Sequence, residues 1–81
     1  MREKMTVQTA EREITDLTLA SYLSTLKHEI LRIEPSNGRS VFIFKCSPKL
    51  AQDEIRFFNR QGSVEPMSFV ETLRYFRAAV R

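Results

Sequence analysis

Two runs of apolar residues flank an Asn-Gly pair, Asn37-Gly38, near the middle of the chain. Asn and Gly both accept the positive φ angles of a type I′ turn, so this pattern predicts a β-hairpin with a two-residue loop. Counting outward from the loop gives four cross-strand pairs: Ser36 with Arg39, Ile33 with Phe42, Leu31 with Phe44, and Glu29 with Cys46. The two apolar pairs share one face of the hairpin, which supports this register.

Three other segments carry apolar residues at helical spacing, and each opens with a capping signal. Thr15-Asp16 offers an N-cap to a first helix over residues 17–27, which we expect His28 to close in a left-handed conformation. Ser47 and Pro48 open a second helix over residues 48–61 that stops at Gly62. A second proline at the first helical position opens a third helix over residues 66–80.

The apolar positions also predict which face of each later helix is buried. For the second helix we expect a buried stripe that consists of Ala51, Ile55 and Phe58, widened by Leu50 and Phe57. For the third helix the expected stripe consists of Phe69, Leu73, Phe76 and Val80.

The order helix, strand, strand, helix, helix predicts a single small α+β domain over residues 14–81. A lone hairpin is not stable in water, so we expect the three helices to cover its apolar face. Residues 1–13 are polar with only sparse apolar positions, which predicts a flexible or weakly ordered N-terminal arm. A short strand near Ile14, or a segment that orders on a partner, is the alternative for this arm.

Composition narrows the class of protein. A chain of 81 residues has room for one domain, and its net charge of +3 is a mild basic bias because acids are interspersed with bases. The single cysteine excludes an internal disulfide and fits a reducing compartment. The longest apolar run, Val41 to Phe44, is far shorter than the roughly 20 residues of a transmembrane helix, and the N-terminus lacks the pattern of a signal peptide. We therefore expect a cytoplasmic protein that does not contact a membrane.

The run from Thr15 to Leu23, Thr-Asp-Leu-Thr-Leu-Ala-Ser-Tyr-Leu, resembles the opening of a small bacterial family described only as domain of unknown function number 5659. The resemblance extends over about residues 14–80, with His28 where we expect a glycine. It rests on the following further positions: Ile33-Glu34, Asn37-Gly38, Phe42-Ile43-Phe44, Val64, Pro66, Phe69, Leu73-Arg74, and Phe76-Arg77. It supports the order of elements and implies no activity, cofactor or catalytic residue.

Chemistry-bearing residues are few. His28, Glu29 and Cys46 form the only potential metal or nucleophile cluster, and we favour structural roles for them, as a helix terminator and a core or half-buried thiol. The carboxylates of Asp53 and Glu54 are adjacent on a helix and do not converge. The sequence contains no glycine-rich phosphate loop and no serine-centred triad. We therefore expect no enzymatic activity, no catalytic or metal-binding residue and no cofactor.

The second and third helices carry arginines at one-turn spacing, with Phe57 and Tyr75 nearby. If the outer faces of the two helices adjoin, these arginines form a basic strip that could contact nucleic acid. The alternative is an ordinary solvated helix surface. The candidate contact residues are Arg56, Arg60, Arg74, Arg77 and Arg81.

The other face of the hairpin suggests a protein interface. The predicted register places three apolar residues, Ile30, Val41 and Ile43, on that face. Pro35 discourages pairing along the first strand, which leaves the second strand as the edge for strand addition. We therefore expect a homodimer, or binding of another protein, through this edge and patch. The alternative is that a helix covers the patch.

These patterns together favour a non-enzymatic protein-interaction or assembly module. An auxiliary nucleic-acid-binding protein is the alternative.

Overall fold

The computed structural model describes residues 10–80, which form an antiparallel three-stranded sheet and three helices. The elements in chain order are β2 (Glu11–Ile14), α1 (Leu17–Thr25), β3 (Ile30–Ser36), β4 (Arg39–Lys45), α2 (Pro48–Phe58) and α3 (Pro66–Ala79). The predicted α+β class, the hairpin and the three helices are confirmed. The order is β-α-β-β-α-α because a strand that was not included in the predicted order, β2, precedes the first helix.

The hairpin of β3 and β4 has the predicted turn. Asn37 and Gly38 have φ angles of 53° and 78°, the two positive values of a type I′ turn. The predicted pairs Ser36 with Arg39 and Ile33 with Phe42 are confirmed, and Glu34 with Val41 and Arg32 with Ile43 pair in the same register.

Further from the turn the predicted register is wrong, because a bulge falls between Ile30 and Arg32. Ile30, not Leu31, pairs with Phe44. The carbonyl of Glu29 accepts a hydrogen bond of 3.0 Å from the Lys45 amide, so Glu29 lies opposite Lys45 and not Cys46. A bulge inserts one residue into one strand, and this insertion turns Ile30 toward the helices.

Strand β2 pairs with β4 and makes β4 the central strand of the sheet, in the order β2-β4-β3. Residues 11–13 are therefore part of the sheet, and the prediction of a weakly ordered arm is wrong for them. The alternative of a strand near Ile14 is correct. The remainder of the predicted arm, residues 1–9, lies outside the described residues.

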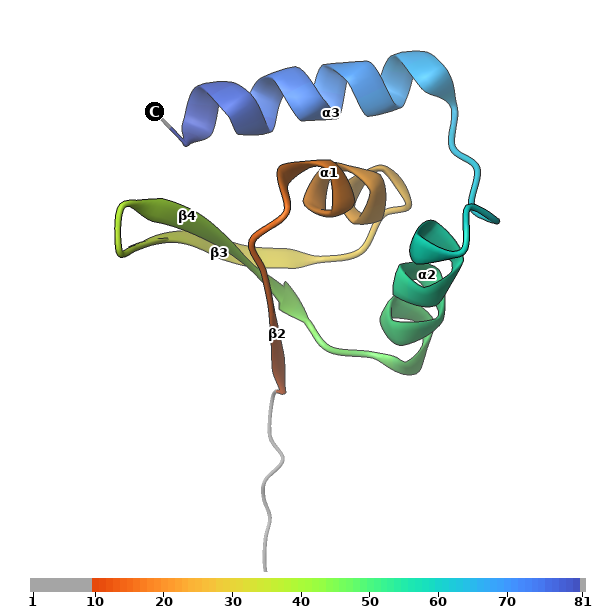
Figure 1. The fold of residues 1–81 in the computed structure, drawn as a ribbon, viewed down its shortest axis with the longest axis horizontal. Helices are drawn as coiled ribbons and strands as arrows, with labels where there is room; N and C mark the ends of the chain where they lie inside the picture. Colours follow the sequence, from red (N-terminus) through yellow and green to blue (C-terminus); the bar gives the residue numbers. More distant parts are fainter. Residues whose placement is uncertain (1–9, 81) are drawn as a thin grey trace, which may run out of the picture.

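The core lies between the sheet and the helices. Helix α1 lies between the sheet and α3, and α2 stands at the end of the sheet where β4 leaves it (Figure 1). Phe76 of α3 packs edge-on against Phe42 of β4, with ring centroids 5.0 Å apart. The buried cluster consists of Ile14, Leu19, Ala20, Tyr22, Leu23, Phe42, Phe44, Leu50 and Phe76. Within residues 10–80, no helix is both long and apolar enough to cross a membrane.

Helix α1 ends at Thr25, two residues before the predicted end, and its left-handed residue lies one position before the predicted His28. Lys27, not His28, is left-handed, with a φ angle of 74°. The Lys27 amide donates to the Ser24 carbonyl and the His28 amide to the Leu23 carbonyl, which is the hydrogen-bond pattern of a Schellman motif. The His28 side chain contacts Asp53 of α2.

Candidate functional site

Helix α2 packs against the rest of the domain largely through charged side chains. Its buried residues are Leu50, Asp53 and Glu54. Asp53 Oδ2 lies 2.6 Å from His28 Nε2, and Glu54 accepts two hydrogen bonds, of 2.9 and 2.8 Å, from the Arg12 guanidinium. Two carboxylates on the inner face of α2 therefore attach this helix to the loop before β3 and to β2.

The environment of Asp53 keeps it ionised. Burial raises the pKa of Asp53, but the hydrogen bond with His28 and the positive charge of Lys49 lower it by more. The net pKa of the Asp53 carboxyl lies below its ordinary value of 3.8. The contact between α2 and His28 therefore includes a carboxylate that is charged at neutral pH.

Because the carboxylates face inward, the apolar stripe of α2 faces outward. Ala51 is exposed, and Ile55 and Phe58 are 59% and 64% exposed. The prediction that these three residues are buried is wrong, and only Leu50 and Phe57, which were expected to widen the stripe, turn inward. We refer to Ala51, Ile55 and Phe58 as the outer face of α2. Three apolar side chains in one row on a helix surface form a candidate interaction site.

The charges around this face have one sign. Both acids of α2 are buried against Arg12 and His28, whereas Arg56 and Arg60 are exposed. Among residues 10–80, no acidic side chain forms an ion pair with either arginine. The exposed charges on this part of α2 are therefore basic.

Helix α2 ends at Phe58, three residues before the predicted end. Arg60 has a left-handed φ angle of 59°, and the amides of Arg60 and Gln61 donate to the carbonyls of Phe57 and Arg56. This is a second Schellman motif, and Arg60 occupies the position that usually holds glycine. Gly62 therefore does not end the helix as predicted.

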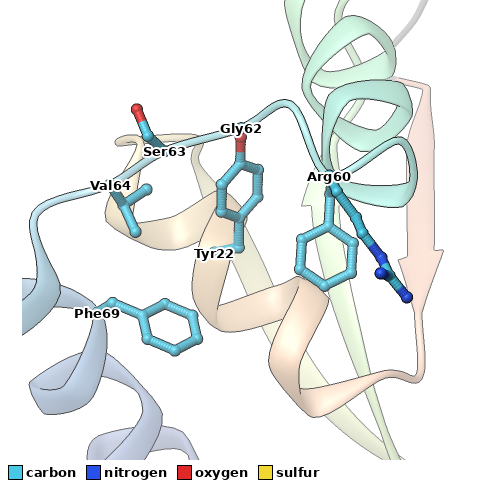
Figure 2. Close-up of a pocket in the computed structure, with 7 residues that line it drawn as sticks. Tyr22, Arg60, Gly62, Ser63, Val64 and Phe69 are labelled. Carbon is cyan, nitrogen blue, oxygen red and sulfur yellow. The ribbon is translucent and has the colours of Figure 1, made fainter.

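A pocket of about 350 Å³ opens beside the end of α2. We refer to it as the tyrosine pocket, and its lining residues are Tyr22, Phe57, Arg60, Gly62, Ser63, Val64 and Phe69. The Tyr22 ring points at the backbone of Gly62 from below (Figure 2). A Cβ atom at residue 62 would lie 1.9 Å from the Tyr22 hydroxyl oxygen, so the close approach requires glycine there.

Aromatic rings connect this pocket to the outer face of α2. Tyr22 packs on Phe57 with ring centroids 5.2 Å apart, and Phe57 packs edge-on against Phe58 at 5.4 Å. Burial raises the pKa of the Tyr22 hydroxyl above its ordinary value of 10.0. Tyr22 is thus a neutral aromatic wall at physiological pH, and apolar surface continues from the exposed Phe58 into the pocket.

The predicted patch of Ile30, Val41 and Ile43 is not an exposed surface. Ile43 and Val41 are 1% and 8% exposed, and the bulge turns Ile30 to the opposite face. Arg32 of β3 forms a bidentate ion pair with Glu11 of β2, with distances of 3.0 and 2.8 Å. Because β2 and β3 flank β4, the Arg32–Glu11 ion pair extends across the central strand. Charged side chains of the flanking strands therefore extend over this face.

The predicted free edge of the second strand is also occupied. Strand β4 pairs with β2 on one side and β3 on the other, so it has no open edge for strand addition. Pro35 lies in the edge strand β3, where proline is tolerated in a sheet.

The structure does not bring the arginines together as one strip. Arg56 lies in the last turn of α2, and Arg60 follows the helix and lines the tyrosine pocket. Arg74 and Arg77 lie in the second half of α3, which runs toward the hairpin turn and away from α2 (Figure 1). Arg81 lies outside the described residues.

His28, Glu29 and Cys46, the potential cluster for which structural roles were favoured, are not brought together as a site in the described residues. His28 pairs with Asp53, and Cys46 is exposed rather than a core or half-buried thiol. In the part of the chain that the structure describes, no three His, Cys, Asp or Glu side chains are placed to hold a metal ion.

The tyrosine pocket and the exposed face beside it were missed from the sequence. One signal for them was present, in the adjacent pair Phe57-Phe58. Neighbouring residues on a helix point about 100° apart, so two successive aromatic rings cannot both lie on one narrow buried stripe. On a helix with a single narrow buried stripe, such a pair favours one exposed ring.

The family described as "Domain of unknown function (DUF5659)" matches residues 10–79, which include every described helix and strand. The chain belongs to this family, as its sequence resemblance suggested. No curated protein and no solved structure matches it.

Proposed function

We propose that this domain is a protein-interaction module that binds its partner through the outer face of α2 and the tyrosine pocket. One observation carries the proposal: Phe58 is 64% exposed although it packs against Phe57, a wall of the pocket. Apolar surface that is both protruding and recessed is typical of sites that bind a protein segment.

The energetics of the two faces of α2 support this proposal. The inner face is held by the Arg12–Glu54 and His28–Asp53 pairs, so the outer face is presented on a fixed helix. Burying the exposed part of Ile55 or Phe58 against a partner would contribute about 1–2 kcal/mol for each side chain. A fixed helix surface also binds with little loss of conformational entropy.

The direct test compares two surface variants in affinity purification from the native host. Ile55→Asp places a charge in the outer face of α2, whereas Tyr75→Asp makes a similar change at a residue of α3 that is 70% exposed. We expect wild type and Tyr75→Asp to retain the same partner at about 0.5 M salt, because apolar contacts are little screened by ions. Ile55→Asp should lose it.

Three results would contradict the proposal. They are equal retention by Ile55→Asp, retention of nucleic acid alone with release at high salt, and no retained partner at all. A second copy of this chain would be detected by light scattering as a mass that rises with concentration, and it should likewise dissociate in Ile55→Asp.

A further inference from the structure

We propose that the tyrosine pocket receives one bulky apolar side chain of a partner peptide, and that Arg56 and Arg60 select acidic residues beside that anchor. This inference rests on the proposed function, since it names the chemistry of the segment bound at the same site.

The walls of the pocket suit an apolar anchor. The rings of Tyr22, Phe57 and Phe69 and the side chain of Val64 line it. Figure 2 shows the Ser63 hydroxyl directed away from these rings, and the Tyr22 hydroxyl directed at Gly62. The volume of about 350 Å³ is at the small end of the range for ligand pockets, about 300–1,000 Å³. A single large side chain fits these dimensions and this chemistry.

The charges beside the pocket favour an acidic peptide. Arg60 lines the pocket on its α2 side, and Figure 2 shows its exposed guanidinium directed away from the Tyr22 and Phe69 rings. Arg56 lies one helical turn earlier, and within residues 10–80 no carboxylate pairs with either arginine. Complementary charge at the rim of an interface accelerates association and excludes partners of the wrong sign.

The same surface is poorly suited to a nucleic acid or a bilayer. Arg74 and Arg77 lie in the half of α3 that runs away from α2, so a phosphate backbone at the pocket would contact few cations (Figure 1). The outer face of α2 has only three apolar residues, on a helix whose opposite side is held by ion pairs. A recess for one side chain suits a peptide better than lipid chains.

The test begins with selection from a displayed library of random peptides of about 16 residues, enough for four helical turns. The bait is the full chain, and duplex DNA and anionic phosphatidylserine vesicles are measured in parallel. We expect the enriched peptides to share one Phe, Leu, Ile, Met or Trp flanked by at least two Asp or Glu. Enrichment of basic or charge-free peptides, no enrichment, or binding to DNA or vesicles alone would overturn the inference.

The decisive variant is Arg60→Gly, which removes the positive charge at this position. Because glycine adopts a left-handed conformation without steric strain, the substitution does not destabilise the fold, and lost binding cannot be attributed to unfolding. Lys27→Gly is the matched control, because Lys27 is also basic, left-handed and placed at a Schellman turn, on α1. We expect the affinity of the selected peptides to fall about tenfold in Arg60→Gly and to change less than about twofold in Lys27→Gly. Equal affinities in the two variants would refute the role of Arg60.

The role of the pocket is tested by Val64→Phe, which narrows it. We expect this variant to bind peptides with a bulky anchor about tenfold more weakly, while circular dichroism confirms that it is folded.

Replacement of the anchor residue by Ala in the peptide provides the same test on wild-type protein. Unchanged affinity in the anchor-to-Ala peptide refutes the anchor, yet loss of binding in Ile55→Asp would still support the proposed function. Full binding to Ile55→Asp contradicts both.

Discussion

Helices α1 and α2 are both short, but they pack in different ways. Helix α1 (Leu17–Thr25) turns its apolar residues inward and buries Leu19, Ala20 and Leu23 to 3% exposure or less. Helix α2 turns two carboxylates inward and leaves Ile55 and Phe58 in water. The difference shows that the apolar stripe of a helix need not be the stripe that packs, when specific partners exist for its charges.

The two helices are held by different forces. Burial of Leu23 is non-directional and stabilises in proportion to the apolar area removed from water. The contacts of Asp53 and Glu54 are directional, and each depends on one partner in another element. Substitutions should therefore affect the two helices differently.

The largest effect is expected on α1. Leu23 is fully buried, and Leu23→Ala should lower the free energy of unfolding by about 2–5 kcal/mol through lost contacts and a cavity. Urea denaturation followed by circular dichroism measures this loss, since the chain contains no tryptophan. A loss below about 1 kcal/mol would mean that α1 is not packed as described.

A smaller effect is expected where α2 meets His28. Asp53→Asn keeps the shape of the side chain but removes its charge, and should lower the free energy of unfolding by about 1–3 kcal/mol. A double-mutant cycle with His28→Ala isolates the pair, and additive losses would show that the two residues are not coupled.

The same carboxylate gives the domain a defined response to acid. Because the pKa of Asp53 is lower in the folded protein, its stabilising contribution is complete above the ordinary pKa of 3.8 and is lost as pH falls through the folded value. Wild type should therefore lose stability with acid below that pH more steeply than Asp53→Asn. Parallel acid profiles of the two proteins would contradict this assignment.

Glycine substitutions at the C-terminal ends of α1 and α2 should change the free energy of unfolding by similar amounts. Lys27 and Arg60 are both left-handed, with φ angles of 74° and 59°. Replacing either by glycine removes the steric cost of the Cβ atom and should raise the free energy of unfolding by about 1 kcal/mol. Thermal unfolding of the two variants measures the gain, and a loss in either would mean that its side chain contributes contacts that exceed the strain.

The smallest effect is expected on the outer face of α2. Ile55 is 59% exposed, and Ile55→Ala should change the free energy of unfolding by less than about 0.5 kcal/mol. A loss comparable to that of Leu23→Ala would show that this face packs inside the protein and would remove it as an interaction surface.

The sequence by itself determined the features that depend on neighbouring residues. Asn37-Gly38 specified the type I′ turn because both residues accept positive φ angles, and the pairing of Ile33 with Phe42 followed from it. Ser47 and Pro48 marked the start of α2, and Pro66 the start of α3, because caps act within one turn of a helix. The α+β class followed from the order of these elements.

Only the tertiary structure decided which surfaces are exposed. The Arg12–Glu54 and His28–Asp53 contacts join residues 42 and 25 positions apart. Because of them, α2 packs with its carboxylates against the domain and leaves its apolar stripe exposed. Strand β2 occupied the edge of β4 in the same way, through polar residues for which the sequence offered a strand only as the alternative. A charged side chain is buried only where a distant partner offsets its loss of hydration, and hydrophobic periodicity carries no information about such partners.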